Sequence, residues 1–146
     1  MKNKEISKNP NKDPEKDLKR KYIEFQLLMQ QISQIQQQVS TINSNILELR
    51  TLTINLDKIK ELKKNKEVLI PVGSNIFIKG SLKDTDKVIM GIGSDVLKEK
   101  TIPETKASIE EQIKELENIN LELEFTLEDA VKKIEILEKE LSQERS

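Results

Sequence analysis

In the last third of the chain, mostly apolar residues recur at strictly alternating intervals of four and three residues, and this pattern constrains the fold more than any other feature. We call these positions the seam, because a coiled-coil helix packs against its partner along such a stripe. The positions are Ile109, Ile113, Leu116, Asn120, Leu123, Leu127, Ala130, Ile134, Leu137 and Leu141. A spacing that averages 3.5 residues over this length is typical of a coiled-coil helix. No glycine interrupts the series, and Pro103 precedes it at a position where the first turn of a helix tolerates proline. Thr101 and Glu104 have the spacing of a capping box. We therefore expect a helix over about 102–143, within a segment 101–146.

A second series of the same kind fills the first half of the chain, with one irregular step between Phe25 and Leu28. Its members are Leu18, Tyr22, Phe25, Leu28, Ile32, Ile35, Val39, Ile42, Ile46, Leu49, Thr53 and Leu56. Asp13-Pro14-Glu15 is a helix-start pattern, and Lys63-Lys64-Asn65 is a helix-end pattern. The series predicts a helix over 14–64, and we interpret its glutamine-rich stretch, 26–40, as solvated helix. The polar residues 1–13 predict a disordered tail.

Charge predicts that these two helices pair with each other. Residues 18–64 carry eight Lys and Arg against four Asp and Glu, whereas 102–146 carry six against thirteen. Unlike charges favour pairing between the two segments over pairing of each with itself. A chain that runs out along one helix and back along the other makes an antiparallel pair.

The segment between the helices has a different character. Four short strand-like runs, at 68–72, 76–82, 88–92 and 96–100, are separated by the turns Gly73-Ser74-Asn75, 83–87 and Gly93-Ser94-Asp95. This pattern predicts two β-hairpins within 66–100. Pro71 cannot donate to a strand ladder, so we expect its strand to be an edge or to begin a bulge. The predicted fold class is mainly α: a long antiparallel coiled-coil hairpin interrupted by two β-hairpins.

The composition of the chain excludes most types of catalytic and metal-binding site. The chain has neither histidine nor cysteine, so the common nucleophile pairs and thiolate metal sites cannot be built. Gly91-Ile92-Gly93 is a bare G-x-G and is better interpreted as a turn than as a nucleotide loop. The basic cluster Lys16, Lys19, Arg20 and Lys21 is better explained as a solvated helix end than as a nucleic-acid site. No apolar run reaches membrane-spanning length, and nothing at the N-terminus predicts a secretory signal. We expect no catalytic residues, no metal, no cofactor, no nucleic-acid or membrane partner, and a cytoplasmic location.

Two features predict interaction. Asn120 occupies a seam position, where a polar side chain sets register or partner choice; the alternative is that it faces solvent where the helices splay. The second feature is a surplus of apolar residues where helix one starts and helix two ends, which predicts a binding surface for nonpolar ligands. Tighter packing or a third helix would explain this surplus equally well. The residues are Leu18, Tyr22, Phe25, Leu27, Leu28, Met29, Ile134, Ile136, Leu137 and Leu141.

The order helix, two hairpins, helix resembles the alpha class of the prefoldin family of chaperones. The resemblance covers the chain from about residue 15, and its most specific stretches are 68–74, 77–80 and 88–94. The beta class carries a single hairpin, so two hairpins favour alpha. The polar tail 1–13 is not part of the family pattern.

The resemblance implies a hexamer of two alpha and four beta subunits, whose hairpins join in an oligomeric β-barrel. It also implies ATP-independent capture of unfolded polypeptides at the coiled-coil tips and their delivery to a group II chaperonin. The implied assembly residues are Val68, Leu69, Ile70, Pro71, Val72, Gly73, Ile76, Phe77, Ile78, Val88, Ile89, Met90, Gly91, Ile92 and Gly93. A self-assembling filamentous structural protein is the alternative, and an enzyme is a distant third.

Overall fold

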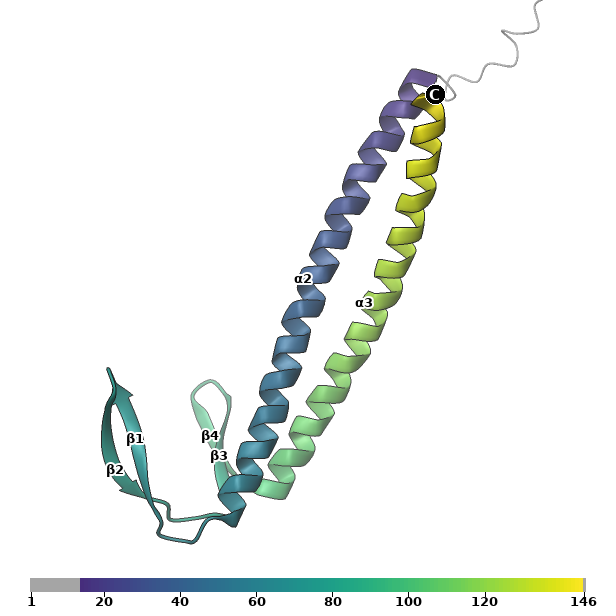
Figure 1. The fold of residues 1–146 in the computed structure, drawn as a ribbon. Coiled ribbons are helices and arrows are strands. Elements are labelled where there is room, and N and C mark those ends of the chain that lie inside the picture. Colours follow the sequence, from purple (N-terminus) through teal and green to yellow (C-terminus); the bar gives the residue numbers. More distant parts are fainter. Residues whose placement is uncertain (1–13, 146) are drawn as a thin grey trace, which may run out of the picture. The chain divides into compact units, whose positions relative to one another are not determined.

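The computed structural model describes residues 14–145, so the tail predicted at 1–13 lies outside the described residues. The chain forms two long helices and, between them in the sequence, two small antiparallel sheets (Figure 1). The elements are α2 (Pro14–Glu61), β1 (Glu67–Gly73), β2 (Ile76–Ser81), β3 (Lys87–Gly93), β4 (Val96–Thr101) and α3 (Ile102–Arg145). The fold is therefore mainly α with a small β module, as the sequence predicts.

The contacts divide the described chain into two units. Unit 1 contains residues up to Ile42 and from Asn118 onward, and unit 2 contains Asn43–Glu117. In unit 1 the start of α2 packs against the end of α3, so the two helices are antiparallel there (Figure 1). The buried cluster of unit 1 consists of Leu28, Ala130, Ile134 and Leu137, with Phe25 and Ile32 packed against it.

Unit 2 has a buried cluster of its own at the other end of the two helices. It consists of Leu56, Ile102, Ile109 and Ile113, and Ile46, Leu49, Ile59 and Val88 pack against it. Every position of the two predicted seams is buried or half-buried. The 3.5-residue spacing therefore identified the packed faces of both helices correctly.

α2 ends three residues before its predicted end at residue 64. The backbone N–H of Leu62 donates to the carbonyl of Ile59 (3.0 Å), which closes a tight last turn. Asn65 adopts the left-handed conformation, with φ of 66°. It lies in the loop, where its N–H donates to Leu82 (2.7 Å), and the N–H of Leu82 donates to Lys66 (2.9 Å). These bonds to a segment far along the chain take Asn65 and Lys66 away from the helical path.

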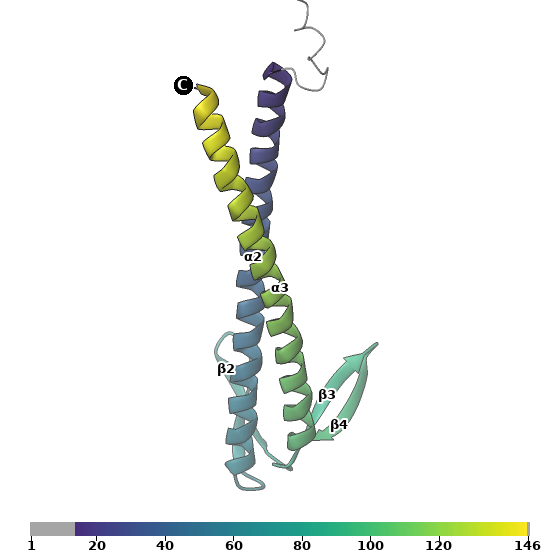
Figure 2. The same cartoon turned by 90° about the vertical axis from the view of Figure 1, so that its right-hand side faces the viewer.

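The two hairpins are built in the same way, and Figure 2 shows β3 and β4 as a pair of their own. In each, both central turn residues have positive φ: Ser74 and Asn75 in one, Ser94 and Asp95 in the other. This is the geometry of the type I′ turn, whose twist matches that of the strands. Each pairing register also shifts by one residue beside the turn, between Pro71 and Gly73 and between Gly91 and Gly93. Of the two alternatives predicted for Pro71, an edge strand or the start of a bulge, the register shift shows the bulge.

The start of α3 is fixed by several hydrogen bonds. The N–H of Glu104 donates to Oγ1 of Thr101 (3.2 Å), as the capping-box spacing predicts, and Oγ1 of Thr105 donates to the carbonyl of Thr101 (2.8 Å). The N–H of Ile102 donates to the carbonyl of Asp86 (2.8 Å), and the Ile102 side chain is fully buried. The start of α3 is therefore hydrogen-bonded to the loop that precedes β3.

The seam makes a testable distinction between two isoleucines. Ile113 is buried in the unit 2 cluster, whereas Ile54 is 55% exposed on α2. We expect Ile113→Ala to lower the free energy of unfolding by about 2–5 kcal/mol, because it removes buried methyl groups and leaves a cavity. Ile54→Ala should change it by less than about 0.5 kcal/mol. Urea unfolding followed by circular dichroism at one protein concentration measures both, and equal effects would contradict the assigned seam.

Candidate interaction surfaces

The hairpins present apolar side chains on both faces. Twelve of the fifteen predicted assembly residues are exposed, and the other three, Val68, Val88 and Met90, are half-buried. A two-stranded sheet alone is marginally stable in water, and each of its strands has one unpaired edge. Such a module requires a further covering surface to be stable.

The sequence analysis missed two residues of this surface. Val96 and Leu97 begin β4 and are 51% and 68% exposed. They directly follow the turn Gly93-Ser94-Asp95, in the position that Ile76 and Phe77 occupy after Gly73-Ser74-Asn75. The likeness of the two hairpins was the signal that could have identified them.

The apolar residues predicted at the helix ends of unit 1 fall into three groups. Leu28, Ile134, Leu137 and Leu141 are buried in the seam, so they support the helix pair rather than form a surface. Leu18, Tyr22 and Phe25 are half-buried. Leu27, Met29 and Ile136 are exposed, each by half or more. The exposed surplus is therefore confined to residues off the seam, and it also includes Ile23, which the sequence analysis omitted.

A hollow of about 390 Å³ lies between the start of α2 and the end of α3 in unit 1. The half-buried aromatic rings of Tyr22 and Phe25 line it, together with Gln26 from α2 and Glu138, Leu141 and Ser142 from α3. The packing between the two helices therefore leaves part of the apolar surface of both rings accessible.

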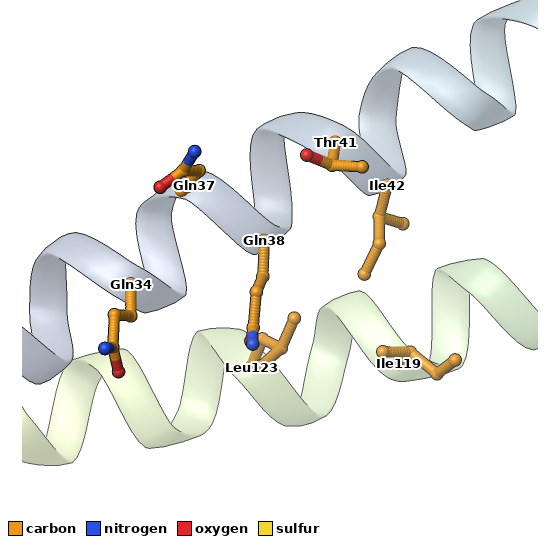
Figure 3. A pocket seen from close by; sticks show the side chains of 7 residues that line it. All are labelled: Gln34, Gln37, Gln38, Thr41, Ile42, Ile119 and Leu123. Atoms are coloured by element: carbon orange, nitrogen blue, oxygen red, sulfur yellow. The ribbon is translucent and has the colours of Figure 1, made fainter.

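A second and larger hollow, which we name the amide groove, lies farther along unit 1. It measures about 710 Å³, and Figure 3 shows the side chains that line it. They are Gln34, Gln37, Gln38, Thr41 and Ile42 from α2, and Ile119 and Leu123 from α3. No lining residue carries a formal charge.

Within the part of the chain that the structure describes, ion pairs join the two helices at three places. Lys21 pairs with Glu140 (3.6 Å) in unit 1, and in unit 2 Arg50 pairs with Glu117 (3.8 Å) and Lys106 with Asp57 (2.6 Å). Two of them place the cation on α2 and the anion on α3, as the charge counts predict. The side chains of the two pairs in unit 2 are 38–52% exposed, so each of those pairs contributes about 1 kcal/mol or less and acts mainly on pairing specificity. Lys21 is more covered, with 20% of its side chain exposed.

Asn120 lies where its seam position predicts, with a half-buried side chain and a buried Oδ1. Its role in register stays a prediction. Among residues 14–145 there is no group of three or more acidic, histidine or cysteine side chains that could hold a metal ion. In the same part of the chain, neither helix has an apolar stretch sufficient to cross a membrane.

Comparison with known proteins gives one family. Residues 28–145 match a family model described as prefoldin subunit. A prefoldin subunit alpha from Methanococcus aeolicus is 30% identical over 127 residues, 87% of this chain and 86% of the relative. One from Methanopyrus kandleri is 42% identical over 86 residues, 59% of this chain and 55% of the relative.

A solved structure is also similar. The filamentous PFD from Methanocaldococcus jannaschii, determined by cryo-electron microscopy, matches with a TM-score of 0.72 and 28% identity. The match covers 82% of this chain and 98% of that chain.

Asn120 and Asn118 provide a matched test of the seam. We expect Asn120→Leu to raise the free energy of unfolding by up to about 1 kcal/mol, because an apolar side chain replaces a partly buried polar one. It should also change the distribution of oligomers, because the polar residue no longer specifies one pairing. Asn118→Leu, at an exposed position of the same helix, should do neither. Thermal unfolding and light scattering measure both effects, and an Asn120→Leu protein identical to the parent would exclude the register role.

Proposed function

Since the chain belongs to the prefoldin family of chaperone subunits, we propose that it is an alpha-class subunit that captures unfolded polypeptides without ATP and delivers them to a group II chaperonin. The observation that carries this proposal is apolar surface that the chain does not cover itself. Leu27, Met29 and Ile136 are exposed off the seam in unit 1, and both hairpins expose aliphatic residues. A stable monomer rarely exposes apolar residues in contiguous groups, as β2 does at residues 76–78, unless they bind something.

The hairpins are proposed to assemble the complex. Prefoldin subunits form oligomers, and the proposed form here is a hexamer of two alpha and four beta subunits. Ile70, Ile78 and Ile89 are exposed near unpaired strand edges. Edge-to-edge pairing with neighbouring hairpins would satisfy the free backbone groups and bury these side chains together.

Client capture is proposed to use several weak contacts. Each exposed aliphatic side chain that becomes buried contributes on the order of 1–2 kcal/mol, which is too little alone to hold a polypeptide. Several subunits that present such residues to one client make binding strong through effective concentration. This type of binding needs no nucleotide.

The similar cryo-electron microscopy structure supports a second candidate. It is a filamentous PFD, and nearly its whole length matches this chain. Hairpins with two open edges could equally join in a repeating, non-closing assembly. The second candidate is therefore a self-assembling filamentous structural protein.

Two matched double variants test client capture. Leu27 and Ile136 are 60% and 57% exposed in unit 1, and Leu47 and Ile54 are 66% and 55% exposed in unit 2. We expect Leu27→Gln with Ile136→Gln to raise the concentration needed for half-suppression of aggregation of denatured lysozyme by about fivefold or more, because the loss of even one contact worth about 1 kcal/mol weakens binding by that factor. Leu47→Gln with Ile54→Gln should leave that concentration unchanged. Equal loss in both pairs would show that these positions of unit 1 have no special role.

The mass of the assembly separates the two candidates. Light scattering of this chain alone should show a small species, and mixing with a beta-class subunit should give a discrete hexamer. Ile78→Asp, at a position 51% exposed on β2, should prevent the hexamer, because a charge would be buried in the new interface. Leu47→Asp on α2 serves as the control. Large filaments formed by this chain alone and unaffected by mixing would favour the structural candidate.

A further inference from the structure

The middle of α2 lacks charge to an unusual degree. In a chain whose residues are 35% charged, no charged side chain occurs between Glu24 and Glu48. A solvated helix face normally carries lysine and glutamate, and α3 carries acidic side chains along most of its length, with lysines toward its two ends. The uncharged stretch supplies five of the side chains that line the amide groove.

The amide groove combines two kinds of surface. Gln34, Gln38 and Ile42 extend from α2 toward α3 (Figure 3), and the aliphatic side chains of Ile42, Ile119 and Leu123 supply its apolar part. Each glutamine amide can donate two hydrogen bonds and accept through its oxygen. The groove therefore offers donors, acceptors and aliphatic surface together.

The aliphatic part is accessible because the seam is less tightly covered here. Val39, Ile42 and Leu123 are half-buried, and Ile119 is 44% exposed. Toward the free helix ends of the same unit, the cluster of Leu28, Ala130, Ile134 and Leu137 is buried. The groove volume lies within the range of about 300–1,000 Å³ that is usual for ligand sites.

The lining chemistry selects among ligands. Phosphate groups and nucleic acids need cationic partners, and stacked bases need aromatic rings, but the lining contains neither. A peptide group is neutral and has one donor and one acceptor, which glutamine amides match. Moving glutamine out of water also costs far less than moving a charged side chain, so an uncharged face can be covered by a neutral ligand.

We propose that the amide groove binds an extended segment of an unfolded polypeptide, with backbone groups on the glutamines and an aliphatic side chain against Ile42, Ile119 and Leu123. This inference rests on the proposed chaperone function and adds a second binding position, separate from Leu27, Met29 and Ile136. Its binding is weak for one segment, and it contributes by holding a client that is also bound elsewhere.

Site-specific crosslinking tests the location. The chain has no cysteine, so Gln34→Cys and Gln36→Cys each create a single attachment point for a benzophenone maleimide. Two residues along an α-helix are turned by about 200°, so the second reagent lies on the other flank of α2. The full chain, assembled with a beta-class subunit, is irradiated with reduced and carboxymethylated lactalbumin, a soluble unfolded protein. We expect a several-fold higher yield from position 34.

Two charge variants test the chemistry. Gln34→Glu with Gln38→Glu places two carboxylates in the groove, where covering them would remove their hydration. We expect this pair to weaken binding of the same probe by about threefold or more, as measured by fluorescence anisotropy. Gln36→Glu with Ser40→Glu adds the same charge at exposed positions outside the lining and should leave binding unchanged. Circular dichroism checks that all variants retain their helix content.

The outcomes separate the inference from the function on which it rests. Equal crosslinking from positions 34 and 36, or equal binding by the two charge variants, would overturn the inference while suppression of aggregation by the parent protein continued. A parent protein that neither suppresses aggregation nor binds the probe would overturn the proposed function and the inference together. Crosslinking from position 34 to a second copy of this chain, unaffected by the probe, would identify the groove as a self-interface and also overturn the inference.

Discussion

The narrow apolar seam between α2 and α3 is the interaction on which the other features depend. Each helix buries mainly this stripe, so each is stabilised mainly by its partner. Apolar residues off the stripe, such as Leu27 and Phe125, are exposed. The stripe is buried at the two clusters, around Ala130 in unit 1 and around Ile102 in unit 2. Because so narrow a stripe is sufficient for pairing, an apolar residue elsewhere on the helices remains in contact with water. The exposed positions Leu27 and Ile136 are thus a direct consequence of the seam geometry.

The hairpins depend on the helices only at their bases. The Asp86 carbonyl accepts from Ile102, and Val88 packs against the unit 2 cluster, whereas Asn65 and Lys66 exchange hydrogen bonds with Leu82. Beyond these points, the strands expose apolar side chains on both faces. Local turn geometry therefore determines their shape, since Ser74-Asn75 and Ser94-Asp95 produce the same turn. Their stability calls for contacts that one chain alone does not make.

The features that sequence predicted correctly are those encoded by local patterns. Spacing identified the seam, short runs separated by turn residues identified the strands, and Thr101 identified the helix start. The end of α2 was placed too late because hydrogen bonds between the loop at 65–66 and Leu82 join residues that no local pattern connects. The predicted binding set contains both seam residues and off-seam residues, because local spacing alone does not show which apolar residues become covered. Leu137, for example, packs in the seam and is buried, and only off-seam members of the set are exposed.

The amide groove could not be predicted, although its glutamines were noticed. Their interpretation as a solvated face considered α2 alone, whereas the groove requires Ile119 and Leu123 of α3 beside them. The spacing of a seam states which residues face the partner helix, but it does not state how closely the helices approach at each level. Ile35 and Ile42 both occupy seam positions, and one is buried while the other is half-buried. That difference arises from packing and not from pattern.

The uncharged middle of α2 has a further consequence for how the helices pair. The interhelical ion pairs of the described residues lie outside 25–47, at Lys21, Arg50 and Asp57. Within that stretch, neighbouring registers present similar aliphatic residues and similar glutamines, so charge cannot distinguish them. A polar residue in the seam can then distinguish the correct register from its neighbours. Asn120 lies on α3 between Ile119 and Leu123, which line the groove with residues of the uncharged stretch. Two proposed roles would therefore follow from the absence of charge in one stretch of α2. These are the role of Asn120 in register and the role of the groove in binding.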